Sequence, residues 1–203
     1  NKYIDNIQMV STSTLKKEDC FYRENTCYNT TIKILYVGRF DKQKGIEDIA
    51  NAIVLLKDLY DIEFLVAGYG DERDKVIVNI EKIFERASIK NKFINFGFKK
   101  NGPDLFEIYK SCDIFITASR FSEGFPRTLW EAFSQSVPVI TTAVGGIPYY
   151  VKDKMHVLFC EPRNPTSIAE KIDSLINDPI LRKNLIENAY ELIETYNLDD
   201  STT

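Results

Sequence analysis

Two glutamates eight positions apart are the first candidates for chemistry. Pro126 is well placed as the first residue of a helix, so Glu123 precedes that helix and Glu131 lies within it. About two turns of helix separate the carboxylates, which allows both to face one cleft at different depths. A carboxylate accepts hydrogen bonds from two hydroxyls, which suits the diols of a sugar or a ribose. The alternative for Glu131 is an ordinary helix residue on the surface.

A loop with three cations supplies candidates for binding an anion. The stretch G-R-F-D-K-Q-K-G, residues 38–45, separates an apolar run from a helical pattern. The planar fork of Arg39 and the point charge of Lys44 together suit a diphosphate. The loop has neither the P-loop spacing nor the G-x-G-x-x-G fingerprint of dinucleotide-binding proteins. A solvated charged loop is the alternative. The amides that follow Pro126 would add an anion site at a helix N-terminus.

Alternating strands and helices must position these side chains. Apolar runs predict strands at 32–37, 62–67, 93–96, 114–117, 137–141 and 157–160, and helical periodicity or start signals predict helices at 46–56, 76–87, 103–110, 126–135, 165–177 and 179–196. This order predicts an α/β fold: a Rossmann-like, doubly wound parallel sheet of about six strands with helices on both faces. We assign residues 1–31 to a linker or arm and residues 32–203 to one domain.

Small residues follow five of the predicted strands. Each of these strand ends contains glycine or alanine, at residues 38–39, 68–70, 97–98, 118–119 and 143–146. Ligands bind beyond the carboxyl ends of parallel strands, and small residues allow a close approach to the backbone. Any one of these glycines could be an ordinary turn residue. Their shared position along one sheet edge predicts a ligand cleft there.

Composition limits the class of partner. The chain has 203 residues, 44% of them hydrophobic and 28% charged, and a net charge of −4, which favours neither nucleic acid nor an anionic membrane as a partner. No apolar run reaches the length of a membrane span. The four cysteines have no zinc-site spacing and are interpreted as reduced thiols of a cytoplasmic protein. The only histidine, His156, is expected to have no catalytic role. The absence of a starting Met predicts a fragment.

Three loops taken together resemble a known family. The segment from Glu123 to Glu131 looks like the E-x7-E motif of retaining glycosyltransferases of family 4, also called group 1. The stretch Y-V-G-R-F-D-K-Q-K-G looks like that family's phosphate-binding loop, and A-V-G-G-I-P like its later glycine-rich loop. E-x7-E alone is a weak signal, but all three loops in order, each after a strand, are a strong one. The resemblance spans residues 32–196 and implies the C-terminal domain of a GT-B fold enzyme.

The resemblance implies a role for each matching residue. Arg39 and Lys44 would bind the diphosphate of a nucleoside diphosphate sugar, and Glu123 would hold hydroxyls of the transferred sugar. These three are the candidate catalytic residues. Glu131 would bind the ribose. The remaining donor-binding candidates are Gly38, Gly97, Phe98, Arg120, Gly124, Phe125, Pro126, Thr128 and Leu129, with Phe98 and Arg120 near the nucleobase. No metal and no cofactor is implied.

The resemblance also sets the expected substrates and the alternatives. The donor would be a UDP-, GDP- or ADP-sugar, and the acceptor a glycan, lipid or small molecule held by a missing N-terminal domain. This fragment alone would bind donor weakly and turn over nothing. A cytoplasmic location is expected, with membrane association of the full-length protein left open. Two departures, Ser136 in place of a frequent Gly and Tyr149 in place of a frequent Glu, affect details. The alternatives are a non-catalytic binding or assembly module, or another GT-B enzyme such as a nucleotide-sugar epimerase or a phosphorylase.

Overall fold

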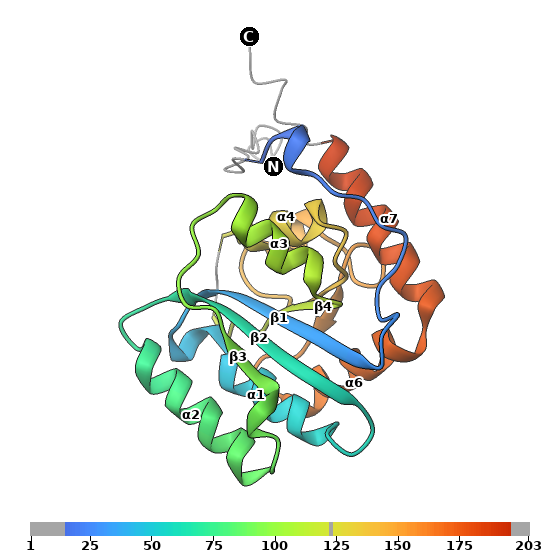
Figure 1. Ribbon diagram of the computed structural model, residues 1–203. Helices are drawn as coiled ribbons and strands as arrows, with labels where there is room; N and C mark the ends of the chain where they lie inside the picture. Colours follow the sequence, from blue (N-terminus) through green and yellow to red (C-terminus); the bar gives the residue numbers. More distant parts are fainter. Residues whose placement is uncertain (1–14, 122–123, 196–203) are drawn as a thin grey trace, which may run out of the picture.

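A six-stranded parallel sheet forms the centre of the computed structural model, which describes residues 15–121 and 124–195 (Figure 1). The strands are β1 (Thr31–Arg39), β2 (Asp61–Tyr69), β3 (Phe93–Asn95), β4 (Ile114–Thr117), β5 (Val139–Thr142) and β6 (Leu158–Cys160). Their order is β3-β2-β1-β4-β5-β6, and each neighbouring pair is parallel. The expected fold class is confirmed, and the strand order reverses between β1 and β4, where such sheets form a ligand crevice.

Helices cover both faces of this sheet. They are α1 (Ile46–Leu55), α2 (Arg73–Arg86), α3 (Pro103–Ser111), α4 (Arg127–Ser134), α5 (Ile147–Tyr150), α6 (Pro165–Asn177) and α7 (Pro179–Thr195). Helices α1, α2 and α6 pack on one face, and α3, α4 and α7 on the other (Figure 1). Successive strand residues point to opposite faces, so Ile34 and Tyr36 join the first apolar layer while Leu35 and Val37 join the second. Burial on both faces explains why the strands read as continuous apolar runs.

The helix boundaries follow the sequence signals closely. Asn164 caps α6, because its side-chain oxygen accepts a hydrogen bond from the amide of Ser167 at 3.0 Å, and Pro165 opens the helix. Helix α4 begins one residue later than predicted. Pro126 has an extended backbone, with φ −68° and ψ 129°, and precedes the first helical residue, Arg127. The amides at the start of α4 therefore belong to Arg127 and the residues that follow it.

The described part of the predicted arm packs against the domain. Residues 15–30 include a short 3-10 helix (Lys17–Asp19) and run beside α7 (Figure 1). Leu15 is buried in the apolar layer of α3, α4 and α7. The Arg23 guanidinium donates to the carbonyl oxygens of Lys110 at 2.9 Å, Cys112 at 2.6 Å and Ser136 at 3.3 Å. Residues 1–14 lie outside the described part, and the boundary at residue 31 stays a prediction.

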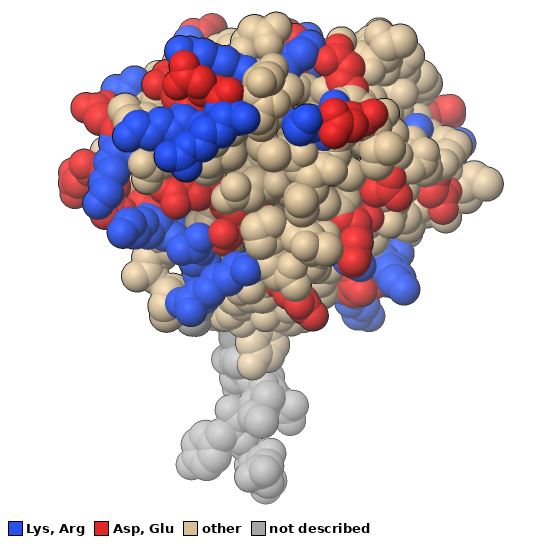
Figure 2. All heavy atoms as spheres, turned by 90° about the horizontal axis from the view of Figure 1, so that it is seen from below, with Lys and Arg blue, Asp and Glu red and all other residues tan. Residues whose placement is uncertain are grey.

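The surface charge is mixed. Figure 2 shows Lys and Arg side chains gathered mainly on the left of the face seen from below, with Asp and Glu side chains between them. Because positive and negative side chains alternate on this face, it has no extended electrostatic potential of a single sign. Among residues 15–121 and 124–195, no helix combines the length and apolar character that crossing a bilayer requires.

Candidate functional site

A hollow of about 480 Å³ opens at the carboxyl ends of β1 and β2, against α3 and α4. Its walls carry cationic, aromatic and carboxylate side chains together with glycine backbone. The lining residues are Val37, Gly38, Arg39, Ala67, Gly68, Tyr69, Phe98, Lys99, Leu105, Arg127, Thr128 and Glu131. The hollow lies where strand ends meet a helix N-terminus, the place that the glycine-rich strand ends predict.

Five of the predicted site residues line this hollow together: Gly38, Arg39, Phe98, Thr128 and Glu131. They come from three separate segments of the sequence, so the fold assembles them. Seven more described candidates lie outside the lining: Lys44, Gly97, Arg120, Gly124, Phe125, Pro126 and Leu129. Glu123 lies outside the described residues, so its predicted role stays a prediction.

Glu131 is the most deeply buried acid of the site. The residue is almost completely buried, although it contributes to the lining of the hollow. One carboxylate oxygen, Oε1, accepts from Arg127 Nε at 2.9 Å, and the other, Oε2, lies 3.0 Å from the hydroxyl of Tyr109. The alternative of an ordinary surface position for Glu131 is therefore wrong. A buried carboxylate costs free energy unless it is paired, and here α4 and α3 each supply a partner.

The two partners act on the protonation of Glu131. Burial raises the pKa of the Glu131 carboxyl above its ordinary value, while the Arg127 cation and the Tyr109 hydroxyl oppose this shift. Burial also raises the pKa of Tyr109 well above its ordinary value, so its hydroxyl stays protonated and donates. The site therefore holds a carboxylate with two donors aimed at it from different helices.

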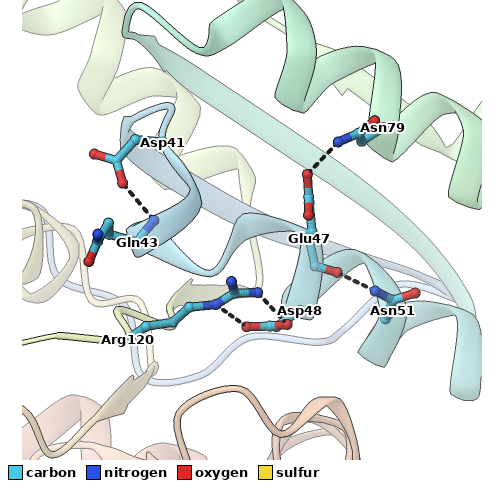
Figure 3. Close-up of polar contacts among 7 residues, drawn as sticks. All are labelled: Asp41, Gln43, Glu47, Asp48, Asn51, Asn79 and Arg120. Carbon is cyan, nitrogen blue, oxygen red and sulfur yellow. Dashed lines mark hydrogen bonds and ion pairs between the residues drawn. The ribbon is translucent and has the colours of Figure 1, made fainter.

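The loop after β1 is ordered by its own side chains. Asp41 accepts from Arg39 Nε at 2.8 Å. It also accepts from the amide of Gln43 at 2.7 Å, a bond that Figure 3 shows and that caps the 3-10 turn Lys42–Lys44. The Arg39 side chain is 61% exposed, so its guanidinium can reach a ligand while it keeps this partner. Lys44 lies at the end of the turn, outside the lining of the hollow.

Arg120, which was expected near the nucleobase, pairs with a residue of α1. Its guanidinium donates to both carboxylate oxygens of Asp48 on α1, at 2.8 and 2.9 Å, and its amide donates to the carbonyl of Gln43 at 2.7 Å (Figure 3). Asp48 is buried in the first turn of α1, and Arg120 supplies the countercharge that this burial requires. This position ties the loop after β4 to the loop after β1, and Arg120 does not line the hollow to which Phe98 contributes.

Several site residues were not identified from the sequence. Arg127, Lys99 and Tyr69 line the hollow, and Tyr109 supports Glu131 from behind. The spacing of four between Arg127 and Glu131 was a usable signal, because such residues face each other on a helix. A second hollow, of about 590 Å³, adjoins the first and shares four lining residues with it. It is lined by Tyr69, Phe98, Lys99, Lys100, Asn101 and Arg127.

Sequence comparison matches the chain to one protein family. The family "Glycosyl transferases group 1" matches residues 21–192. An uncharacterized glycosyltransferase of Methanocaldococcus jannaschii is 32% identical over 168 residues, which cover 82% of this chain and 42% of that protein. The N-acetyl-alpha-D-glucosaminyl L-malate synthase of Bacillus anthracis is 26% identical over 160 residues, 79% of this chain and 40% of that protein. The chain thus spans less than half the length of these relatives.

Solved structures give the same result. The C-terminal domain of the group 1 glycosyl transferase LpcC from Francisella tularensis superposes with a TM-score of 0.73 at 30% identity, covering 82% of this chain and 87% of that one. HepE from Anabaena, solved with UDP and glucose, has the same fold, with a TM-score of 0.75 at 19% identity over 83% of this chain and 45% of its own. The chain belongs to the group 1 glycosyl transferase family and has the fold of the C-terminal half of a GT-B enzyme.

Proposed function

We propose that this chain is the donor-binding domain of a retaining glycosyltransferase, which moves a sugar from a nucleoside diphosphate sugar to an acceptor hydroxyl. The observation that carries the proposal is the hollow that brings the exposed Arg39 and the buried, paired Glu131 together at the carboxyl edge of the sheet. Membership of the family supports the reaction class.

The hollow has a part for each portion of the donor. Arg39 and Lys99 offer cationic contacts for the diphosphate, and the amides at the start of α4 add partial positive charge. Glu131 would accept hydrogen bonds from the ribose hydroxyls. The exposed rings of Tyr69 and Phe98, whose centroids are 5.5 Å apart, offer apolar surface for the nucleobase.

Arg39, which lines the hollow, and Lys44, which lies in the same loop outside the lining, would also act during the reaction. Negative charge grows on the leaving phosphate as the bond to the anomeric carbon breaks, and cations fixed beside that phosphate stabilise the transition state more than the ground state. We propose that these side chains and the α4 amides neutralise the diphosphate without a metal, and we assign no covalent nucleophile. Glu123 would hold hydroxyls of the transferred sugar.

The acceptor would bind in a domain outside this chain. We propose that the acceptor is a glycan, lipid or small molecule and that the reaction takes place in the cytoplasm. Closure between two domains completes many active sites, so this chain alone should bind donor weakly and transfer no sugar. Analysis of the anomeric configuration of the product made by the full-length protein tests retention.

Calorimetry tests the proposed donor site. UDP is the first probe, because HepE, a protein of the same fold, was solved with UDP-glucose, and GDP and ADP complete the set. We expect heat with one of the three diphosphates and a loss of affinity in Arg39→Met and Glu131→Gln. Lys183→Met, which removes exposed ion pairs with Glu187 on α7 and with Glu24 in the arm, is the control. A folded chain that gives no heat with any of the three would overturn the proposal.

A further inference from the structure

Arg127 occupies a position that helix stability does not explain. It is the first residue of α4, where the helix dipole disfavours a cation. Its partner Glu131 follows it by four positions, and this order of charges is the less favourable one on a helix. A pair that gains little for the helix and still lies in the wall of a hollow points to a role in the site.

The two side chains of this ion pair differ in their exposure to solvent. The Glu131 side chain is 1% exposed and the Arg127 side chain 49% exposed. Arg127 lines both the 480 Å³ hollow and the adjoining 590 Å³ hollow. Its Nε is bound to Glu131, so a half-exposed cation with one buried partner stands at both hollows.

Counting the acceptor sites shows what Glu131 has left for a ligand. A carboxylate has about four lone-pair sites, two on each oxygen. Arg127 occupies one site on Oε1, and the Tyr109 hydroxyl occupies one on Oε2. With respect to the residues that the structure describes, one site remains on each oxygen. Two acceptors in one rigid plane match the two neighbouring hydroxyls of a ribose, which would each donate one hydrogen bond.

We propose that Arg127, together with Tyr109, is a positioning residue that keeps Glu131 ionised and fixes the plane of its carboxylate for the 2′- and 3′-hydroxyls of a ribose. This inference rests on the proposed function, because it requires a nucleotide in the hollow. Arg127 acts through Glu131 and needs no contact of its own with the ligand.

Groups from four segments surround or face the Glu131 carboxylate. Tyr109 reaches it from α3 and Arg127 from α4, while Arg39 at the end of β1 and Lys99 after β3 line the same hollow. Arg127 is the only cation that forms an ion pair with this carboxylate among the described residues. Its removal should therefore let the buried carboxyl take up a proton, which converts one acceptor oxygen into a donor.

The test compares each ribonucleoside diphosphate with its 2′-deoxy form by calorimetry at pH 7.5. The probe pairs are UDP and 2′-deoxy-UDP, GDP and 2′-deoxy-GDP, and ADP and 2′-deoxy-ADP. We expect the wild-type chain to prefer the ribo form by about tenfold, the effect of one charge-assisted hydrogen bond. Arg127→Met should lose most of that preference and weaken the deoxy form less than the ribo form, because the deoxy form has only its 3′-hydroxyl to lose as a donor to Glu131. Arg127→Lys should restore part of it, and Tyr109→Phe should reduce it.

Two variants and the wild type make the outcomes distinguishable. Lys183→Met removes a Lys–Glu pair of the same spacing on α7 and should keep the full ribo preference. An equal loss of both forms in Arg127→Met would mean that Arg127 contacts the phosphates directly, which overturns the inference while the proposed function stands. An unchanged ribo preference would overturn it as well. A wild-type chain that binds no nucleotide would remove the proposed function and this inference together.

Discussion

Arg120 donates two hydrogen bonds to Asp48, from Nε to Oδ2 at 2.9 Å and from Nη2 to Oδ1 at 2.8 Å. The pair joins the loop after β4 to α1, and the amide of Arg120 adds a bond to Gln43 in the loop after β1 (Figure 3). Two loops that flank the switch in strand order are therefore held together by one largely buried ion pair.

Breaking this pair should destabilise the domain. Asp48→Asn and Arg120→Met should each lower the free energy of unfolding by about 2 kcal/mol, because each leaves a largely buried charge without its partner. Urea unfolding measures both, and the double variant should lose less than the sum of the two. Lys90→Met, which removes an exposed pair with Glu85, should cost below about 0.5 kcal/mol and serves as the control. Additive losses would show that the two side chains are not coupled.

Replacement of Glu131 should separate stability from binding. Glu131→Gln removes a buried charge and leaves Arg127 half in solvent, so the free energy of unfolding should change by no more than about 1 kcal/mol. Affinity for a nucleoside diphosphate should fall about 10- to 100-fold, because hydrogen bonds to a charged acceptor are lost. Calorimetry and urea unfolding on the same sample measure both. Glu107→Gln is the exposed control, and a parallel loss of stability would indicate a purely structural role.

The burial of Glu131 also predicts a pH dependence. Its folded-state pKa lies above the ordinary value of 4.5, so the folded chain binds more protons than the unfolded chain between these two pKa values. The contribution of Glu131 to the free energy of unfolding is therefore greatest at or below pH 4.5 and decreases as the pH rises through the folded-state pKa. Urea unfolding at several pH values should show a flatter profile for Glu131→Gln than for the wild type. Superimposable pH slopes would contradict this.

Arg23 should hold the arm in place. Its guanidinium donates to three carbonyl oxygens at the ends of α3 and α4, so Arg23→Met leaves these acceptors without their donor. We expect the free energy of unfolding to fall by about 2 kcal/mol and residues 15–30 to become easier to cleave by protease. Lys16→Met, whose side chain is exposed, is the control within the same arm. Unchanged proteolysis in Arg23→Met would show that other contacts keep the arm docked.

Gly45 is fixed by the close approach of two loops. Its φ is +66°, and a Cβ atom there would lie 2.1 Å from the carbonyl oxygen of Ala118. Gly45→Ala should therefore lower the free energy of unfolding by more than about 2 kcal/mol, since a clash with backbone adds to an unfavourable φ. Gly124→Ala, where a Cβ would meet nothing within 4 Å, is the matched control. Equal thermal stability of the two variants would mean that the loops can separate without cost.

The sequence predicts the framework well and the contents of the hollow only in part. Apolar runs and start signals such as Asn164 identify all six strands and the bounds of α6, because burial and capping leave local patterns. Pairings between distant segments leave no local pattern in the sequence. The hydrogen bonds of Arg120 to Asp48 and of Tyr109 to Glu131 therefore become visible only in the folded structure. The arm has no apolar period because hydrogen bonds from Arg23 hold it, and these require no repeating sequence.

The hollow and the Arg120–Asp48 ion pair involve helices on different faces of the sheet. Helices α3 and α4 contribute Leu105, Arg127, Thr128 and Glu131 to the wall of the hollow, whereas the Asp48 anchor of the loops belongs to α1 on the opposite face. Substitutions that retune ligand preference can thus accumulate on one side while the other side goes on holding the loops in register. For protein engineering, this makes the α3–α4 layer the place to diversify and the α1 layer the place to leave intact.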